Sequence, residues 1–384
     1  MSKHRAIIPD IAQGIYPFKG VKLSRADVEW LLATHENGRG PVIWFDESQQ
    51  HRNGLDLRGA DLRGEDLSRL PLARMRGGLR FDEWEQATIE QRDWASIRLE
   101  NCNLFWAHLN HAKLRKAHLQ RTELSRAHLE GADLCEAHLE EANLTRAHLE
   151  GTHLIGAHLE KVNLSGALLE KARLENITLS DEKRTGPQMV DAQLGDTNLA
   201  IIKWSQVEML ADENRARERK HDGKVKDKAT QLDGYERAVR AYRQLAIALQ
   251  NQGINEDAAR FAYRAQILQR KVLWKQRNFW KWLGSALLAL LAGYGYRMWR
   301  ILAAYLIIVS ICAGAYFIIG IYYAPHLSLL QAFLESITAF HGRVFYEAFT
   351  PDTPQIWVTA FEAIMGLVIE GVFIAMLAQK FFGK

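Results

Sequence analysis

Leucine recurs at every fifth position from Leu99 to Leu179, which gives 17 consecutive occurrences. The residue two positions earlier is small or slim, and it is alanine in 11 of the 17 cases. The spacing continues weakly to Trp204 and appears in another phase from Leu57 to Leu72, so we expect an irregular insert between Leu72 and about Trp94. A period of five fits neither a helix nor an alternating strand, and it predicts a coil with four short faces that turn leucine and alanine inward.

This pattern resembles the pentapeptide repeat family, whose consensus is A(D/N)LXX and whose fold is a right-handed quadrilateral β-helix. The match covers residues 97–179 and, less completely, 55–72. The resemblance implies that residues 20 apart stack at about 4.8 Å, the spacing of neighbouring strands. We predict a β-helix over 55–204 and an N-terminal cap over 1–54, in which a short helix at Leu23–Leu32 covers the open end of the stack.

Some members of this family mimic DNA through an acidic face. Residues 97–179 hold 10 Lys and Arg against 11 Asp and Glu. This stretch is therefore too neutral for a mimic of DNA.

Histidine recurs every ten residues within the repeats, each time just before a leucine, and Glu130 to Glu170 follow the same interval. The histidines are His108, His118, His128, His138, His148 and His158. In a four-faced coil they form two columns on opposite faces. We expect solvated, duplicated surface positions and no metal site, because metal ligands converge on a pocket that a straight column does not offer. A metal-binding or pH-sensing role is the alternative.

Three further segments follow the repeats. Residues 205–230 are strongly charged and are predicted to form a linker. Residues 231–276 show two amphipathic helical patterns separated by Gly253, and the pair resembles one tetratricopeptide unit. One such unit is too few for a free-standing array, so we expect a helical hairpin packed on a neighbour rather than a peptide-binding domain.

The C-terminal quarter is apolar and predicts a membrane module. Residues 299–322 and 356–378 are each long enough to cross a hydrocarbon core of about 30 Å. Residues 277–296 contain an apolar stretch too short to span, next to Trp280 and Trp282, and predict an interfacial helix. Lys and Arg concentrate before the first span, so we expect both termini and the β-helix in the cytoplasm and the chain in the plasma (inner) membrane.

The loop at 327–350 carries an apolar, helix-forming stretch that is too short to cross. Together with its flanks, over 297–384, it resembles the two-transmembrane, one-pore-loop ion channels of the potassium-channel superfamily, and more narrowly the channels that carry pentapeptide repeats in front of this module. The resemblance implies an α-helical pore module, a homotetramer, monovalent cations as permeant ions, and a re-entrant pore helix that includes Glu335, Ser336 and Thr338.

The segment that matches the selectivity filter departs from the potassium pattern T-V-G-Y-G-D. It consists of Phe340, His341, Gly342, Arg343, Val344 and Phe345. Only the first glycine is kept, Arg343 replaces the tyrosine, and the β-branched Val344 replaces the second glycine. We therefore expect a weakly selective cation pore, with an anion pore as one alternative. The other alternative is that Glu335 or Glu347 neutralises Arg343 behind the filter. The sequence Gly293-Tyr294-Gly295 precedes the first span and is interpreted as a turn.

Glu362, Gly366 and Glu370 fall on one stripe of the second span. Intramembrane carboxylates face a cavity or a partner, so these three residues are candidates to line the pore, with Gly366 as a hinge. The alternative is that a glutamate pairs with a neighbouring helix or with Arg297 or Arg300.

The 384 residues carry a formal net charge of only +4 and three cysteines, which argues against a nucleic-acid partner and a disulfide framework. We find no catalytic constellation, so no enzyme, catalytic residue or cofactor is expected. The predicted function is a tetrameric ion channel that contacts membrane lipid and whose repeat domain serves assembly, gating or docking of a cytoplasmic protein. The alternative is a membrane-anchored scaffold that binds a protein partner.

Overall fold

A computed structural model describes most of the chain. The described residues are 4, 7–49, 51–218, 227–292, 299–324, 326–343 and 353–382. They divide into two compact units, Met1–Gln269 and Arg270–Lys384. Gly293-Tyr294-Gly295, Val344, Phe345 and Glu347 lie outside the described residues, so the interpretations attached to them stay predictions.

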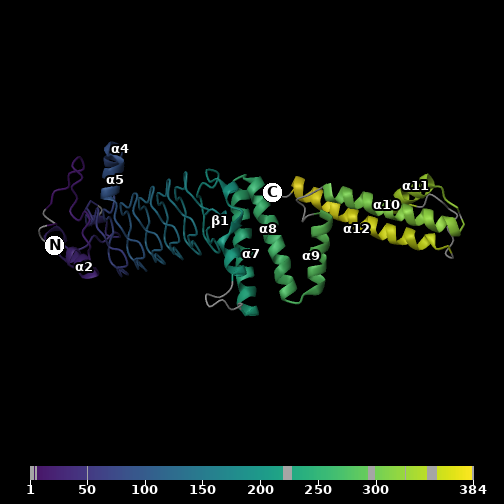
Figure 1. Cartoon of the computed structure of the whole chain (residues 1–384), viewed down its shortest axis with the longest axis horizontal. Coiled ribbons are helices and arrows are strands. Elements are labelled where there is room, and N and C mark those ends of the chain that lie inside the picture. The colour runs from purple at the N-terminus through teal and green to yellow at the C-terminus, as the bar shows by residue number, and fades with distance from the viewer. Residues whose placement is uncertain are drawn as a thin grey trace. The chain divides into compact units, whose positions relative to one another are not determined.

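The first unit contains the β-helix, whose coils stack along the repeats (Figure 1). Parallel bridges join residues 20 apart, from Arg98 with His118 to His158 with Thr178. The leucines and the small residues two positions before them are buried. Each face is so short that it pairs through single bridged residues. The described residues contain only two named strands, β1 (Thr185–Gly186) and β2 (Met209–Leu210). The five-residue period therefore produces the predicted stack of parallel coils.

The turns between the faces have left-handed backbone. The residue two positions after each repeat leucine has a positive φ along most of the stack, as at Trp106 (56°), Arg126 (58°) and Gly151 (64°). Most of these positions are occupied by residues other than glycine, which carry a steric cost in this conformation. These residues adopt the turn because the leucine before it and the alanine after it must both point into the coil.

The expected insert interrupts the stack before Arg98. Asp61 pairs with Arg98, so the usual step of 20 residues becomes 37 and 17 additional residues leave the coil. They form α4 (Phe81–Gln86) and α5 (Ile89–Ala95). Helix α5 begins with a capping box between Thr88 and Gln91, and at the start of α4 the Glu83 carboxylate accepts from the backbone N–H of Arg80. Trp84 packs with Tyr16 and anchors the insert to the N-terminal segment.

Helical segments precede the first coils at the N-terminal end of the stack. Helix α2 (Arg25–Ala33) begins after Ser24, whose hydroxyl accepts from the backbone N–H of Asp27 in a capping box. Val28, Leu31 and Leu32 on its inner face are buried. The short elements α3 (His35–Gly38) and η1 (Glu47–Gln49) follow.

The C-terminal end of the stack corrects the prediction of a linker over 205–230. Residues up to 217 are folded, as η2 (Trp204–Gln206), β2 (Met209–Leu210) and α6 (Ala211–Arg217), and β2 pairs in parallel with β1 (Thr185–Gly186). The charged residues do not keep this segment in solvent as a linker. Glu213 is fully buried and forms an ion pair with Arg264. Residues 219–226 lie outside the described part.

Two long helices form the predicted hairpin beside the last coil. They are α7 (Lys228–Asn251) and α8 (Asn255–Lys275), separated by Gly253 with φ 77°. The side-chain amide of Gln252 donates to Thr197 O and accepts from the backbone N–H of Leu199, both at 2.7 Å. The hairpin therefore lies against the end of the β-helix.

The second unit is helical. It contains α9 (Phe279–Ala292), α10 (Trp299–Tyr322), α11 (Leu329–Phe340) and α12 (Gln355–Phe382) (Figure 1). Within the described residues, two stretches are long and apolar enough to cross a membrane, Trp299–Tyr322 and Gln355–Ile374, which contain 18-residue windows with mean hydropathies of 2.4 and 1.8. Large apolar side chains such as Ile311 and Leu367 point outward from both, as expected of surfaces that face lipid or another chain.

Candidate functional site

The short helix α11 packs against both membrane-length helices. Ser328 caps its start by accepting from the backbone N–H of Gln331. Its last residue, Phe340, is 2% exposed and meets the ring of Tyr305 edge-on at 4.8 Å between centroids. Midway, the Ser336 hydroxyl donates to Val309 O at 2.9 Å. Helix α11 therefore runs back alongside α10, from near its C-terminal end to the level of Tyr305.

The chain then returns to the end of α10 that it left. The Gln355 side chain at the start of α12 donates to Tyr323 O, just after α10, at 3.5 Å. The segment between Tyr322 and Gln355 thus begins and ends beside the same end of the helix pair.

Glu362 joins the three helices from within. It is fully buried, and its Oε1 is hydrogen-bonded to the Ser336 hydroxyl of α11. Nearby, the Tyr316 hydroxyl of α10 donates to Thr359 Oγ1 at 2.9 Å. A buried carboxyl group needs such hydrogen bonds. The placement agrees with the alternative in which this glutamate pairs with a neighbouring helix.

Glu370 lies in a different environment. Its Oε1 is 2.6 Å from Nδ1 of His341, the second residue of the predicted filter, and both side chains are about half exposed (45% and 50%). The stripe of carboxylates on α12 is therefore divided, with Glu362 inside the helix contact and Glu370 at its edge.

Gly366, between the two glutamates, lies where α12 comes closest to α11. A Cβ atom at this position would collide with the backbone carbonyl of Phe340. The glycine is required for close packing of the two helices. Its role as a hinge and the pore-lining role of all three stripe residues stay predictions.

The described part of the predicted filter forms the end of α11. Backbone N–H groups of His341, Gly342 and Arg343 donate back to carbonyls of Thr338 and Ala339, at 2.9 to 3.1 Å. Gly342 has φ 69°, the left-handed conformation that commonly ends a helix. These three residues are exposed, whereas Glu335 and Ser336 on the same helix are buried.

Three residues of this site were not singled out from the sequence: Tyr316, Gln355 and Thr359. Each is a polar side chain inside or at the edge of an apolar span and is now seen to bond to another helix or its adjoining turn. Their polarity could have marked them as contact positions, but their partners are 32 to 43 residues away in the chain.

Comparison with known proteins identifies the repeats. Residues 102–140 and 142–181 match the family model of pentapeptide repeats, in eight copies. No curated protein matches the chain.

Several solved structures of pentapeptide repeat proteins are similar to part of the chain. Rfr23 from the cyanobacterium Cyanothece 51142 is 28% identical, covers 34% of this chain and 86% of its own, and has a TM-score of 0.23. A protein from the Arabidopsis thaliana thylakoid lumen is 22% identical, with 47% and 90% covered and a TM-score of 0.15. HetL, involved in heterocyst differentiation regulation in Nostoc sp. strain PCC 7120, is 23% identical, with 38% and 80% covered and a TM-score of 0.10.

Proposed function

We propose that this pentapeptide repeat protein is a non-enzymatic membrane protein whose second unit assembles, as a homotetramer, into an ion-conducting pore. The observation that carries the proposal is the position of α11, which packs between two membrane-length helices while its flanking segments return to one end of them. The β-helix then serves assembly, gating or docking of a protein partner.

The length of α11 supports a re-entrant segment. Twelve residues make about 18 Å of helix, too little for a hydrocarbon core of about 30 Å. Its end at Phe340 lies beside Tyr305, the seventh residue of α10. A membrane anchor needs only one apolar helix and has no use for such a segment.

The exposed turn after α11 supports a shared, water-lined path. His341, Gly342 and Arg343 carry polar groups at the level of Tyr305 and are exposed in the single chain. Non-helical backbone at membrane depth is tolerated only where it lines water or is buried in protein. Neighbouring copies of the chain around a central pore satisfy that requirement.

The charges near this turn favour monovalent cations. The Glu370 carboxylate is half exposed, and a ring of carboxylates concentrates cations. Arg343 opposes this effect, which is why we expect weak selectivity. Basic residues before α10 orient both termini toward the cytoplasm by the positive-inside rule.

The experiment that tests the proposal is ion flux from liposomes that contain the purified full chain, under potassium, sodium and chloride gradients in turn. We expect cation flux that falls in Gly342→Ala and changes in Glu370→Gln. Glu256→Gln, at an exposed position of α8, is the matched control and retains the flux. Unaltered conductance in both Glu362→Gln and Glu370→Gln would remove the role of these carboxylates in conduction.

A scaffold is the second candidate function, and the surface of the insert favours it. Phe81, Ile89 and Trp94 are 60%, 66% and 43% exposed on α4 and α5, and exposed apolar side chains commonly mark protein contacts. Absence of flux for every ion, from protein shown to be folded and tetrameric, would contradict the channel and favour the anchored scaffold.

A further inference from the structure

We propose that the β-helix binds two divalent transition-metal ions, one on each of its histidine columns. The first column is His108, His128 and His148, and the second is His118, His138 and His158. The first site consists of His128, Glu130 and His148, and the second of His138, Glu140 and His158. This inference does not depend on the proposed pore.

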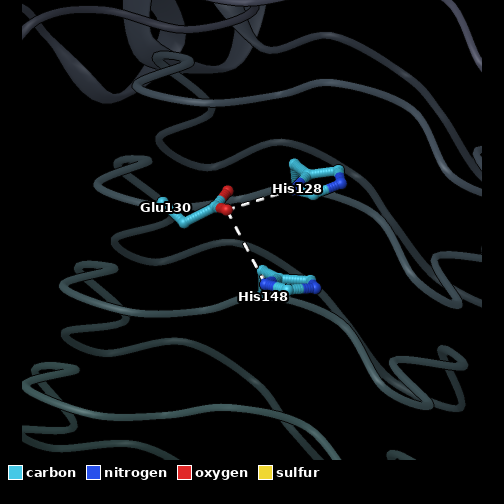
Figure 2. A group of neighbouring side chains, drawn as sticks. All are labelled: His128, Glu130 and His148. Carbon is cyan, nitrogen blue, oxygen red and sulfur yellow. Dashed lines mark hydrogen bonds and ion pairs between the residues drawn. The ribbon is translucent and has the colours of Figure 1, made fainter. Parts of the chain in front are cut away.

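In the first site, the carboxylate of Glu130 lies close to both histidines (Figure 2). Glu130 Oε1 lies 3.0 Å from Nδ1 of His128 and 3.8 Å from Nδ1 of His148, on the next coil. The other oxygen, Oε2, accepts from the side-chain amide of the fully buried Asn110 at 2.5 Å. A second residue that orients a ligating carboxylate is typical of metal sites.

The second site repeats this arrangement ten residues later. Nδ1 of His138 is 3.1 Å from Glu140 Oε1, and the ring of His158 stacks on that of His138 at 4.7 Å. The buried Oε2 of Glu140 has no hydrogen-bond partner among the described residues. Coordination of an ion by that oxygen would therefore break no hydrogen bond to a described residue.

The distances are close to those that a metal requires. Bonds of about 2.0–2.2 Å from Zn²⁺ to nitrogen and oxygen place two ligands of one ion no more than about 4.2 Å apart. The ligand atoms within each group already lie within 4.8 Å of one another. Since stacked rings do not share a plane, binding requires one imidazole to turn about χ2, a soft torsion.

The repeats themselves limit the number of sites to two. A site needs a histidine, a glutamate two residues later and a second histidine twenty residues later. Twenty residues before Glu130 and Glu140, the positions that would supply the carboxylate are Asn110 and Gln120, whose side chains are neutral amides. After His148 and His158 the columns continue with Leu168 and Thr178, which leaves Glu150 and Glu160 without a second imidazole.

Two imidazoles and one carboxylate suit zinc and its neighbours in the first transition row. The six side chains are between 19% and 39% exposed, so water completes the coordination. Because each ion would join two neighbouring coils, it would bind the folded state alone and stabilise the stack by mass action.

The test is a zinc titration of the full chain, purified in detergent without a histidine tag and freed of metal, with calorimetry and the melting temperature as readouts. We expect two ions per wild-type chain and a higher melting temperature. Glu130→Gln and Glu140→Gln each bind one ion, and the double variant binds none. These amides recreate the natural arrangement around Asn110 and Gln120, so the fold is expected to tolerate them.

The matched control is the double variant Glu150→Gln and Glu160→Gln, which removes two carboxylates of the same columns and retains both ions. The proposal is overturned if the wild-type chain binds no zinc, if the Glu130 and Glu140 variants bind as many ions as the wild-type chain, or if the control loses as many ions as they do.

Discussion

At the turns of the β-helix, where every fifth residue has left-handed backbone, the identity of a single side chain affects the stability of the fold. A Cβ atom costs about 1–2 kcal/mol in this conformation. Glycine removes that cost, but it loses more entropy on folding than other residues. The chain accepts the strain at most turns and has glycine at others, among them Gly59, where φ is 75° and neighbouring atoms come close.

Two glycine substitutions separate strain from crowding. At Gly151 an added Cβ would meet nothing within 4 Å, so Gly151→Ala should cost about 1 kcal/mol, from backbone strain alone. At Gly59 it would meet Trp94 O at 2.7 Å and Lys19 Cα at 2.8 Å, and overpacking adds about 1–3 kcal/mol. The melting temperature of Gly59→Ala should therefore lie well below that of Gly151→Ala. Equal losses would contradict this assignment of the crowding.

Asp212 makes the stability of the first unit depend on pH. It is 7% exposed, and burial raises its pKa to about 6, although its carboxylate accepts from the backbone N–H of Met189 at 2.8 Å. The unfolded chain releases this proton near pH 4 and the folded chain near pH 6. The contribution of this group to stability is therefore lost as the pH rises from about 4 to about 6.

Asp212→Asn should remove that loss. The melting temperature of the variant should rise relative to wild type as the pH increases across this window, because the amide never ionises and can still accept from Met189. Asp233→Asn, at a side chain that is 55% exposed, is the control. A constant difference between Asp212→Asn and wild type from pH 4 to pH 7 would refute the linkage.

At the scale of elements, prediction succeeds where the pattern is local. The expected span at 299–322 has the bounds of α10, and the span at 356–378 lies within α12 (Gln355–Phe382). The coil register follows directly from the leucine period. The folded segment after Trp204 is not predictable in this way, because Glu213 is buried by residues up to 51 positions away. The Ser336–Glu362 contact between α11 and α12 is hidden for the same reason.

Glu213 should hold α6 to the helical hairpin. Its Oε2 accepts from Arg264 Nε at 2.8 Å and from the Tyr242 hydroxyl at 2.9 Å. Loss of one partner of a buried ion pair costs about 3–5 kcal/mol, and the partial exposure of Arg264 (35%) reduces this cost. We expect Glu213→Ala to lower amide exchange protection in α7 and α8.

Protection in the coils before Leu179 should stay unchanged, because each coil pairs with its neighbours. Glu218→Gln, next to α6, is the control, since Glu218 is exposed and its carboxylate bonds only to the Asn214 side chain among the contacts described. Uniform loss of protection across the first unit would show instead that the hairpin and the stack unfold together.

At the scale of the whole molecule, the two units are built from two different sequence patterns. The first unit is built from short-range repeats that bury leucine against alanine, and the second from long apolar helices that leave large side chains such as Trp357 exposed. The first pattern gives a water-soluble surface and the second does not. This contrast predicts a membrane only around the second unit.

Thiol labelling tests that arrangement, and the chain is suited to it. All three cysteines are buried, and burial raises the pKa of the Cys102 and Cys135 thiols to about 12, so little reactive thiolate is present. A wild-type chain in sealed right-side-out vesicles should therefore react poorly with an impermeant maleimide. Tyr323→Cys, just after α10 at a position that is 56% exposed, should react from outside under the proposed topology, in which the segment between the spans faces away from the cytoplasm.

Ser205→Cys provides the opposite case, at an exposed position beyond the repeats. It should react only after the vesicles are permeabilised, because the proposed topology places the first unit on the cytoplasmic side, with the basic residues before α10. Labelling of Ser205→Cys in intact vesicles, with Tyr323→Cys protected, would invert the topology. That result would also contradict the proposed cytoplasmic role of the β-helix, while leaving its metal sites testable on the same chain in detergent.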